Sequence, residues 1–271
     1  MALNDTKASV GRYLKLLGAF FSNSLTRDME FKANFFGLLF VDFVYYGSYL
    51  LFFNIIFSYV DSLLEFTKAD VMVFLVITFL MDTLYMFAFA GNLGKLNRMI
   101  VRGDLDFVLL KPVNSQFFIS FRYFNSYALL SVVILSVLLW VTGVNSGREI
   151  SLINVGFFLF SFGMGLAILL SVDFIIASLA FWFKNFSVGG WLSHEILKFS
   201  SRPDTIYTGL LRKTMFTFVP MALISSVPAR MLLYGPRLDY FVIQMIVSSL
   251  FLVVARIVWT RGLRLYDSAS S

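Results

Sequence analysis

Long apolar stretches recur along the chain, and they constrain its fold more than any other feature of the sequence. A helix needs about 20 mostly apolar residues to cross a bilayer. Five stretches meet this requirement, at residues 33–57, 71–90, 117–142, 153–183 and 238–260. Only 14% of the residues are charged, whereas globular domains average about 25%. The sequence therefore predicts an all-α integral membrane protein that forms a single domain over residues 1–271.

A sixth transmembrane helix is expected before the last one, in a less regular region. Residues 214–233 are apolar but contain two prolines, so they predict a kinked span. Alternatively, residues 186–200 form a short span and 203–233 form broken, re-entrant helices, which require surrounding protein or water. The basic stretch 184–213 favours the kinked span, because Lys and Arg concentrate in cytoplasmic loops. Either arrangement gives six transmembrane helices.

The distribution of Lys and Arg also predicts the orientation of the helices. These residues are frequent in residues 1–32, in 91–122 and after residue 260, whereas loops 58–70 and 143–151 contain one each. Cytoplasmic loops carry this excess. We therefore expect both termini and the loop between the second and third spans to lie in the cytoplasm.

The first residues predict a different kind of helix. Apolar side chains recur along one helical face of residues 8–27, at Val10, Leu14, Leu17 and Phe21. This spacing favours an amphipathic helix that lies in the cytoplasmic membrane interface before the first span. A cap helix that packs on the rest of the protein is the alternative.

Residues 92–112 form a charged element in the loop between the second and third spans. Residues 92–102 predict a short helix with one apolar and one basic stripe. The apolar stripe consists of Leu93, Leu96 and Ile100, and the basic stripe of Lys95, Arg98 and Arg102. A loop that only fixes topology needs no apolar stripe, so we interpret the element as a docking surface for a cytoplasmic partner.

The second half of this element predicts another short helix. Gly103 is suited to end the first helix, and Asp104 is suited to cap a second one that runs to about Leu110. Pro112 then ends the second helix before the third span. We expect a partner to contact the basic stripe together with Asp104 and Asp106.

Four charged residues fall inside or beside the predicted spans. Asp42, Asp82 and Asp173 lie within the first, second and fourth spans, where a carboxylate costs at least about 2.5 kcal/mol. They are candidates for a translocation path or for polar contacts between helices. Arg256, near the end of the last span, either extends to the interface or pairs with Asp173. In the same fourth span, Gly163 and Gly165 are suited to close helix packing.

Several classes of site are excluded or disfavoured by the sequence. The chain has no Cys and a single His, at position 194, which excludes disulfides and metal sites with several His ligands. A phosphate loop requires G-x-x-x-x-G-K-[ST], and the nearest stretch, GNLGKL at 91–96, has the wrong glycine spacing. We therefore expect no enzyme activity, metal or cofactor on this chain. The net charge of +6 predicts orientation in a membrane rather than nucleic-acid binding.

Three stretches resemble a known family. They are RGDLDFVLLKPVNSQF at 102–117, PDTIYTGLLRKTMFTFVPMALISSVPARMLL at 203–233 and the tail WTRGLRLYDSASS at 259–271. Together they resemble the permease subunits of type-2 ATP-binding-cassette (ABC) exporters, in the six-span branch formerly catalogued as a domain of unknown function. The family usually has a small residue where Asp267 stands here.

The resemblance implies a set of partners and a location. It implies a permease that pairs with an identical or related second permease in the bacterial-type inner membrane and binds two cytoplasmic ATPase subunits, which carry ATP and Mg²⁺. Residues 92–111 would then be the coupling helix that contacts the ATPase. The alternatives are an ion- or proton-coupled secondary transporter that uses Asp42, Asp82 and Asp173, and a membrane scaffold without transport.

Overall fold

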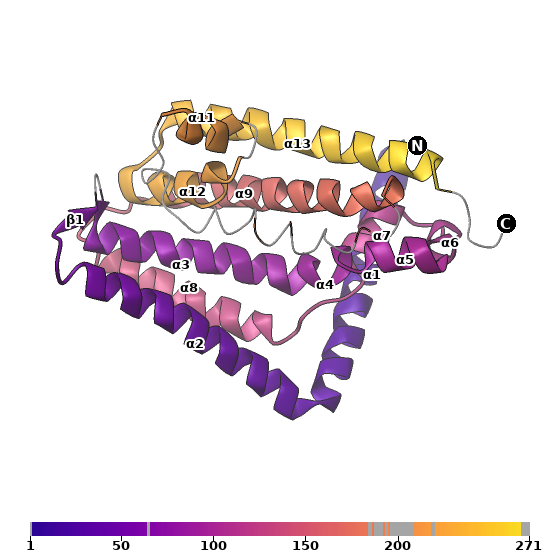
Figure 1. Ribbon diagram of the computed structural model, residues 1–271, viewed down its shortest axis with the longest axis horizontal. Coiled ribbons are helices and arrows are strands. Elements are labelled where there is room, and N and C mark those ends of the chain that lie inside the picture. The colour runs from indigo at the N-terminus through magenta and orange to yellow at the C-terminus, as the bar shows by residue number, and fades with distance from the viewer. Residues whose placement is uncertain are drawn as a thin grey trace.

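The computed structural model consists almost entirely of helices, and its long helices run side by side along the long axis (Figure 1). It describes residues 2–63, 66–183, 186, 192, 195, 209–217 and 220–266. The bundle is formed by α2 (Lys32–Ile56), α3 (Lys68–Tyr85), α8 (Ala128–Val144), α9 (Leu152–Ser178), α12 (Ala222–Tyr234) and α13 (Leu238–Arg264). The strands among the described residues are β1 (Ser62–Leu63) and β2 (Phe66–Thr67), which pair antiparallel.

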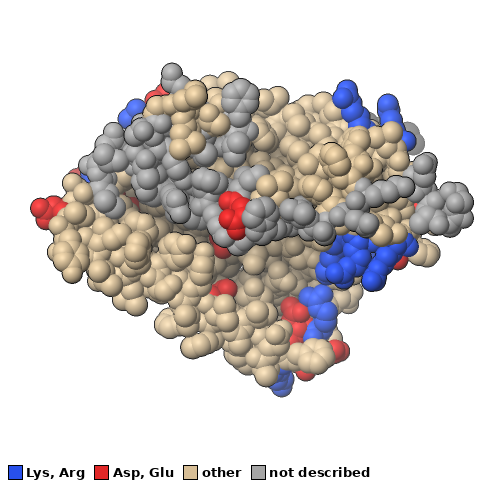
Figure 2. Space-filling view, in the orientation of Figure 1, with Lys and Arg blue, Asp and Glu red and all other residues tan. Residues whose placement is uncertain are grey.

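A group of short helices gathers at one end of this bundle (Figure 1). They are the π-helix η1 (Met86–Ala90), α4 (Gly91–Leu93), α5 (Leu96–Arg102), α6 (Asp104–Leu109), α7 (Ser115–Phe121) and the 3-10 helix η2 (Leu179–Phe181). Most Lys and Arg side chains visible in Figure 2 lie at this end. We call it the basic end; it is the end that the charge distribution predicts to be cytoplasmic.

Within the part of the chain that the structure describes, four helices are long and apolar enough to cross a membrane. They span residues 32–56, 68–102, 152–181 and 238–264. Each overlaps a predicted span, at 33–57, 71–90, 153–183 and 238–260. The second continues beyond its predicted end because the π-helix, α4 and α5 follow α3 toward the basic end.

The predicted span 117–142 is not one continuous helix, which corrects the sequence interpretation. The chain forms α7 and then α8, with residues 122–127 between them outside any helix. This segment reads RYFNSY. Side chains from other elements bind backbone N–H and C=O groups that no helix satisfies here, as described below. Such partners allow a helix to break within an otherwise apolar stretch.

The predicted kinked span 214–233 is also broken. It divides into α11 (Gly209–Thr217) and α12, with Pro220 between them; Pro lacks the N–H that would continue a helix. The 13 residues of α12 reach only about 20 Å, short of a bilayer core. The broken-helix alternative describes this stretch better, although most of its short span at 186–200 lies outside the described residues, as does His194.

Helix α1 (Ala2–Glu30) crosses the basic end, transverse to the bundle (Figure 1). One of its faces packs on the protein: the ring centroids of Tyr13 and Phe117 are 4.6 Å apart, and Phe20 lies against Phe118. Val10 and Leu14, on the face that the sequence predicts to be apolar, are exposed. Phe21, on the same predicted face, packs against Phe87 and Phe124. That face is therefore open near Val10 and Leu14 and packed near Phe21, and its placement in the membrane interface stays a prediction.

Helix α9 forms the centre of the bundle, and a glycine brings α12 close to it. A Cβ atom at Gly165 would lie 2.6 Å from the backbone oxygen of Ile224, whereas one at Gly163 would meet no atom within 4 Å. The expected role in close packing therefore applies to Gly165 and not to Gly163. The buried Gln244 of α13 also joins these helices, because its amide donates to the backbone oxygens of Ser161 and Leu223.

Candidate functional site

The element of residues 92–112 packs into the basic end through one apolar face. Four of its apolar side chains are buried, namely Leu93, Leu96, Leu105 and Val108. They form a core with Phe118 of α7, Phe174 of α9 and Trp259 of α13. The predicted apolar stripe is thus confirmed for Leu93 and Leu96, and Ile100 packs at its edge. The element is anchored to the ends of two long helices.

The turn between α5 and α6 depends on Gly103. Its φ of 77° lies in the left-handed region that glycine adopts without a steric penalty. This glycine ends α5 and also precedes α6, so Asp104 is not the helix cap that the sequence predicts. Asp104 and Asp106 lie instead in the first turn of α6, where a carboxylate interacts favourably with the helix dipole.

The outer face of the element contains apolar residues that the sequence analysis missed. Arg98, Arg102 and Asp104 are exposed as expected. Beside them, Phe107 and Leu110 are 69% and 81% exposed. Their spacing of three residues, offset from the buried Leu105 and Val108, was the available signal for a second apolar face.

Two of the predicted contact residues point elsewhere. The Nζ of Lys95 lies 3.8 Å from the centroid of the Tyr123 ring, so this cation faces the α7–α8 connection rather than the outer face. Asp106 is half-buried beside Tyr266, which follows α13. Burial, together with the neighbouring Asp106 carboxylate, raises the pKa of Tyr266 to about 12. The predicted set is therefore not one continuous surface.

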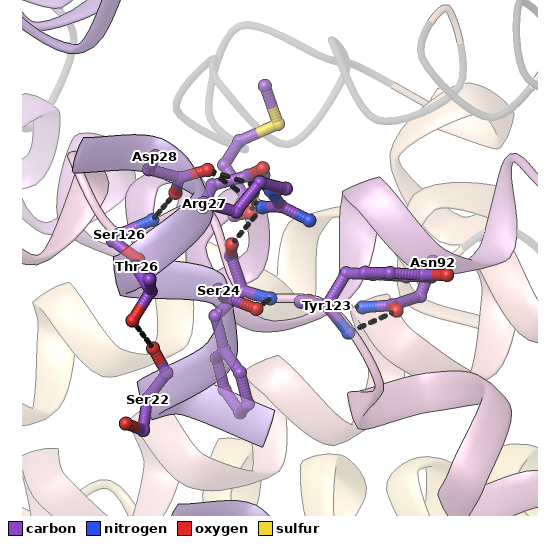
Figure 3. A network of polar contacts seen from close by, with 11 residues as sticks. Ser22, Ser24, Thr26, Arg27, Asp28, Asn92, Tyr123 and Ser126 are labelled. Carbon is purple, nitrogen blue, oxygen red and sulfur yellow. Dashed lines mark hydrogen bonds and ion pairs between the residues drawn. The ribbon is translucent and has the colours of Figure 1, made fainter. Parts of the chain in front are cut away.

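The non-helical segment 122–127 is held by helix α1 (Figure 3). Ser24 accepts a hydrogen bond from the backbone N–H of Phe124 (3.0 Å), and Arg27 donates to its carbonyl oxygen (3.1 Å). Asp28 accepts from the backbone N–H of Ser126 (2.9 Å) and also pairs with Arg27 (2.8 Å). These side chains replace the backbone partners that a continuous helix would have supplied.

The same segment is held from its other side by Asn92 of α4. The side-chain amide of Asn92 donates to the carbonyl oxygen of Tyr123 (2.7 Å) and accepts from the N–H of Tyr123 (2.8 Å). Asn92 itself is buried. We call residues 122–127 with these partners the joint, because they connect α1, α4 and the third predicted span.

Comparison with known proteins identifies the chain. A family model described as ABC-2 family transporter protein matches residues 43–270. The chain belongs to the ABC-2 transporter family. No curated protein matches it. Membership makes this ABC-2 protein a multi-pass membrane transport permease, and it implies association with an ABC ATPase partner.

The intramembrane carboxylates of this ABC-2 permease contact hydroxyl groups on neighbouring helices. Asp42 of α2 accepts a hydrogen bond from Ser131 of α8 (2.8 Å). Tyr46 of α2 donates to Asp82 of α3 at 3.4 Å. In this way two of the three candidate carboxylates connect adjacent helices, a contact that lowers the cost of placing a polar group in the membrane.

The third carboxylate does not have the partner that the sequence suggested. Asp173 of α9 accepts a hydrogen bond from Tyr85 of α3, whereas Arg256 is exposed and donates to Gln116 of α7. The hypothesis of an Asp173–Arg256 pair is therefore wrong. Arg256 reaches across to the start of the third predicted span instead.

A buried ion pair at the end opposite the basic end was also missed. Asp70 is fully buried at the start of α3 and pairs with Arg148 (2.8 Å) from the α8–α9 loop. The hydroxyl of Tyr234 donates to the same carboxylate. Asp70 and Arg148 fall in the stretches 58–70 and 143–151, which the sequence predicts as short loops and which served only to predict orientation.

A groove runs between α2 and α8 of the permease and has a volume of about 640 Å³. Its walls are apolar, with Asp42, Tyr46 and Ser131 as its polar groups. Most side chains of α2 are exposed, and only Phe35 and Tyr46 are buried. This helix therefore presents an open apolar face along the groove.

Proposed function

We propose that the chain is the permease subunit of an ATP-driven exporter, coupled to separate cytoplasmic ATPase subunits through residues 92–111. One observation carries the proposal: the element has a buried face packed on α9 and α13 and an outer face with exposed Phe107 and Leu110. An element packed in this way transmits displacement to the bundle, because packed interiors have low compressibility.

The ATP and Mg²⁺ belong to the ATPase subunits in this proposal. The sequence lacks the glycine spacing of a phosphate loop, so the proposal places ATP hydrolysis on the partner subunits and assigns no cofactor and no catalytic residue to this chain. Two ATPase subunits and a second permease, identical or related, complete the transporter. The basic end then faces the cytoplasm of a bacterial-type inner membrane, with both chain termini on that side.

The proposed translocation path lies at the open face of α2. The groove between α2 and α8 contains Asp42 and Ser131 among apolar walls, and a second permease that packs on α2 would enclose it. Apolar walls with a few polar groups are typical of small-molecule sites. The proposed cargo is therefore amphiphilic.

A matched pair of substitutions tests the coupling. Leu110→Glu places a charge on the outer face, and Tyr59→Glu places one at the opposite end; the two side chains are 81% and 84% exposed. Affinity purification from native membranes should recover an ATPase with the unmodified chain and with Tyr59→Glu. Leu110→Glu should lower the recovery about tenfold or more, as expected for a central interface residue.

Two outcomes oppose the proposal. The coupling surface is wrong if Leu110→Glu and Tyr59→Glu recover the ATPase equally well. The ATP-driven class is wrong if no ATPase is recovered from any membrane preparation. A secondary transporter would then be the better description, and its activity should depend on an ion gradient and on Asp42, Asp82 and Asp173.

A further inference from the structure

A cavity of about 610 Å³ lies between α1 and the chain segment that leads into the third predicted span. Leu16 and Phe20 of α1 form one wall, and Val113 and Phe118 form the other. Arg27, Lys111 and Arg122 also line it. The cavity thus combines apolar walls with three cations at the basic end of the bundle.

Cations at and beside this cavity gather around one aromatic ring. Arg27, Lys95 and Arg122 approach the single ring of Tyr123, with charged groups 5.6, 3.8 and 5.2 Å from its centroid. Like charges gathered around one ring repel one another, and burial together with the neighbouring Arg27, Arg122 and Arg98 lowers the pKa of Lys95. Long side chains at an interface are free to extend into water and so to avoid this repulsion. Their convergence indicates a place where negative charge is required.

Lys111 and Arg122 share a second ring in the same cavity. Both cations lie over Phe118, at 5.5 and 5.2 Å from its centroid. Among the described residues, the acidic group paired with this cluster is Asp28, which binds Arg27. Neither Lys111 nor Arg122 has an ion pair with a described residue. The cluster therefore keeps a positive excess beside an apolar wall.

We propose that this cavity binds the headgroup of an anionic phospholipid, with the lipid phosphate at Arg122 and Lys111. Guanidinium and ammonium groups bind phosphate by charge-assisted hydrogen bonds, and basic pockets at the cytoplasmic ends of membrane helices suit anionic headgroups. Phe20 and Val113 would contact the start of the acyl chains. The lipid would thereby fasten α1 to the joint, a role that does not depend on the proposed ATPase docking.

Native mass spectrometry of the full chain, purified with any native partners, tests this site. The probes are dimyristoyl phosphatidylglycerol, dimyristoyl phosphatidylcholine and inorganic phosphate, so that acyl chains and headgroup charge are varied separately. The unmodified protein should bind the anionic lipid at least about tenfold more tightly than the zwitterionic one, which corresponds to about 1.4 kcal/mol. This preference should decline as salt screens the charges.

Paired double variants locate the site. Lys111→Gln with Arg122→Gln should abolish the preference for the anionic lipid. Arg261→Gln with Arg264→Gln removes the same charge from exposed positions in the last turn of α13 and should preserve the preference. Lys111→Arg with Arg122→Lys keeps both charges and should also preserve the preference. This variant still tests the role of charge if the neutral variant fails to fold.

Three results would overturn the proposal. Equal binding of the two lipids by the unmodified protein excludes a charge-selective site, whether or not any variant folds. Equal loss of preference in the two neutralised variants assigns the effect to net charge. Displacement of the anionic lipid by millimolar inorganic phosphate would assign the cavity to a free anion instead of a lipid.

Discussion

Replacing Gly165 by alanine tests how tightly the bundle is packed around α9. The added Cβ would lie 2.6 Å from the carbonyl oxygen of Ile224 and 2.9 Å from the Cε of Met81. The end of a methionine side chain can move, because it has several rotatable bonds. A backbone oxygen of α12 cannot move alone, so the whole helix must shift by roughly 0.8 Å to restore an ordinary contact.

The expected cost follows from a comparison with Gly163→Ala. Both substitutions gain about 0.5–1 kcal/mol from the higher helix propensity of alanine. Only the one at Gly165 overpacks a closed interface, which typically costs about 1–3 kcal/mol. The difference in free energy of unfolding between the two variants therefore isolates overpacking, and we expect about 1–3 kcal/mol.

Reversible unfolding in mixed detergent and sodium dodecyl sulfate, followed by far-UV circular dichroism, measures this difference. Gly163→Ala should unfold at the same or a higher denaturant fraction than the unmodified chain, and Gly165→Ala at a lower one. Two variants that agree within about 0.5 kcal/mol, the usual range for surface substitutions, would show that α12 does not pack on α9 as described.

Three further predictions concern the joint, the buried ion pair and the coupling turn. Asn92→Ala should lower the free energy of unfolding by about 2 kcal/mol, since it removes the three hydrogen bonds of a buried side chain. The exposed Asn145→Ala should not; the detergent assay measures both. Arg148→Gln should cost roughly 1–3 kcal/mol because it leaves a buried carboxylate without its charged partner. Arg237→Gln, which breaks an exposed pair, should leave the unfolding transition unchanged in the same assay. Gly103→Val should strain a left-handed turn by about 1–2 kcal/mol and reduce ATPase recovery; normal recovery would contradict the assigned role of this turn.

The periodicity and length of apolar stretches predict those parts of the fold that depend on hydrophobic burial alone. The spans at 33–57 and 238–260 agree with α2 and α13 because uninterrupted apolar residues leave the backbone no better partner than its own helix. The breaks at 122–127 and around Pro220 could not be predicted in this way. In the first, the side chains that satisfy the backbone come from α1 and α4, which lie 100 and 31 positions away in the chain.

In the candidate site too, helical spacing predicts some residues correctly and fails for those whose partners lie on another segment. The inward stripe of Leu93 and Leu96 follows from helical spacing, and the structure buries both residues. The direction of Lys95 does not follow from spacing, because the Tyr123 ring that it faces belongs to a different segment. Asp173 likewise contacts Tyr85 and not Arg256, since two residues at similar predicted depth can lie on different sides of a bundle.

The joint gives α1 a role beyond anchoring the chain to the membrane surface. Asn92 lies in α4, two residues after the π-helix that continues α3, and its side chain binds both backbone groups of Tyr123. The next residue, Phe124, is held in turn by Ser24 and Arg27 of α1. Hydrogen bonds weaken steeply when they are stretched or bent. Helix α1, helix α4 and segment 122–127 must therefore move together or break the five side-chain hydrogen bonds that join them. Any displacement that a partner imposes on the coupling element is therefore expected to tilt α1 as well as the spans, and a spectroscopic label on the exposed Leu14 should report that movement.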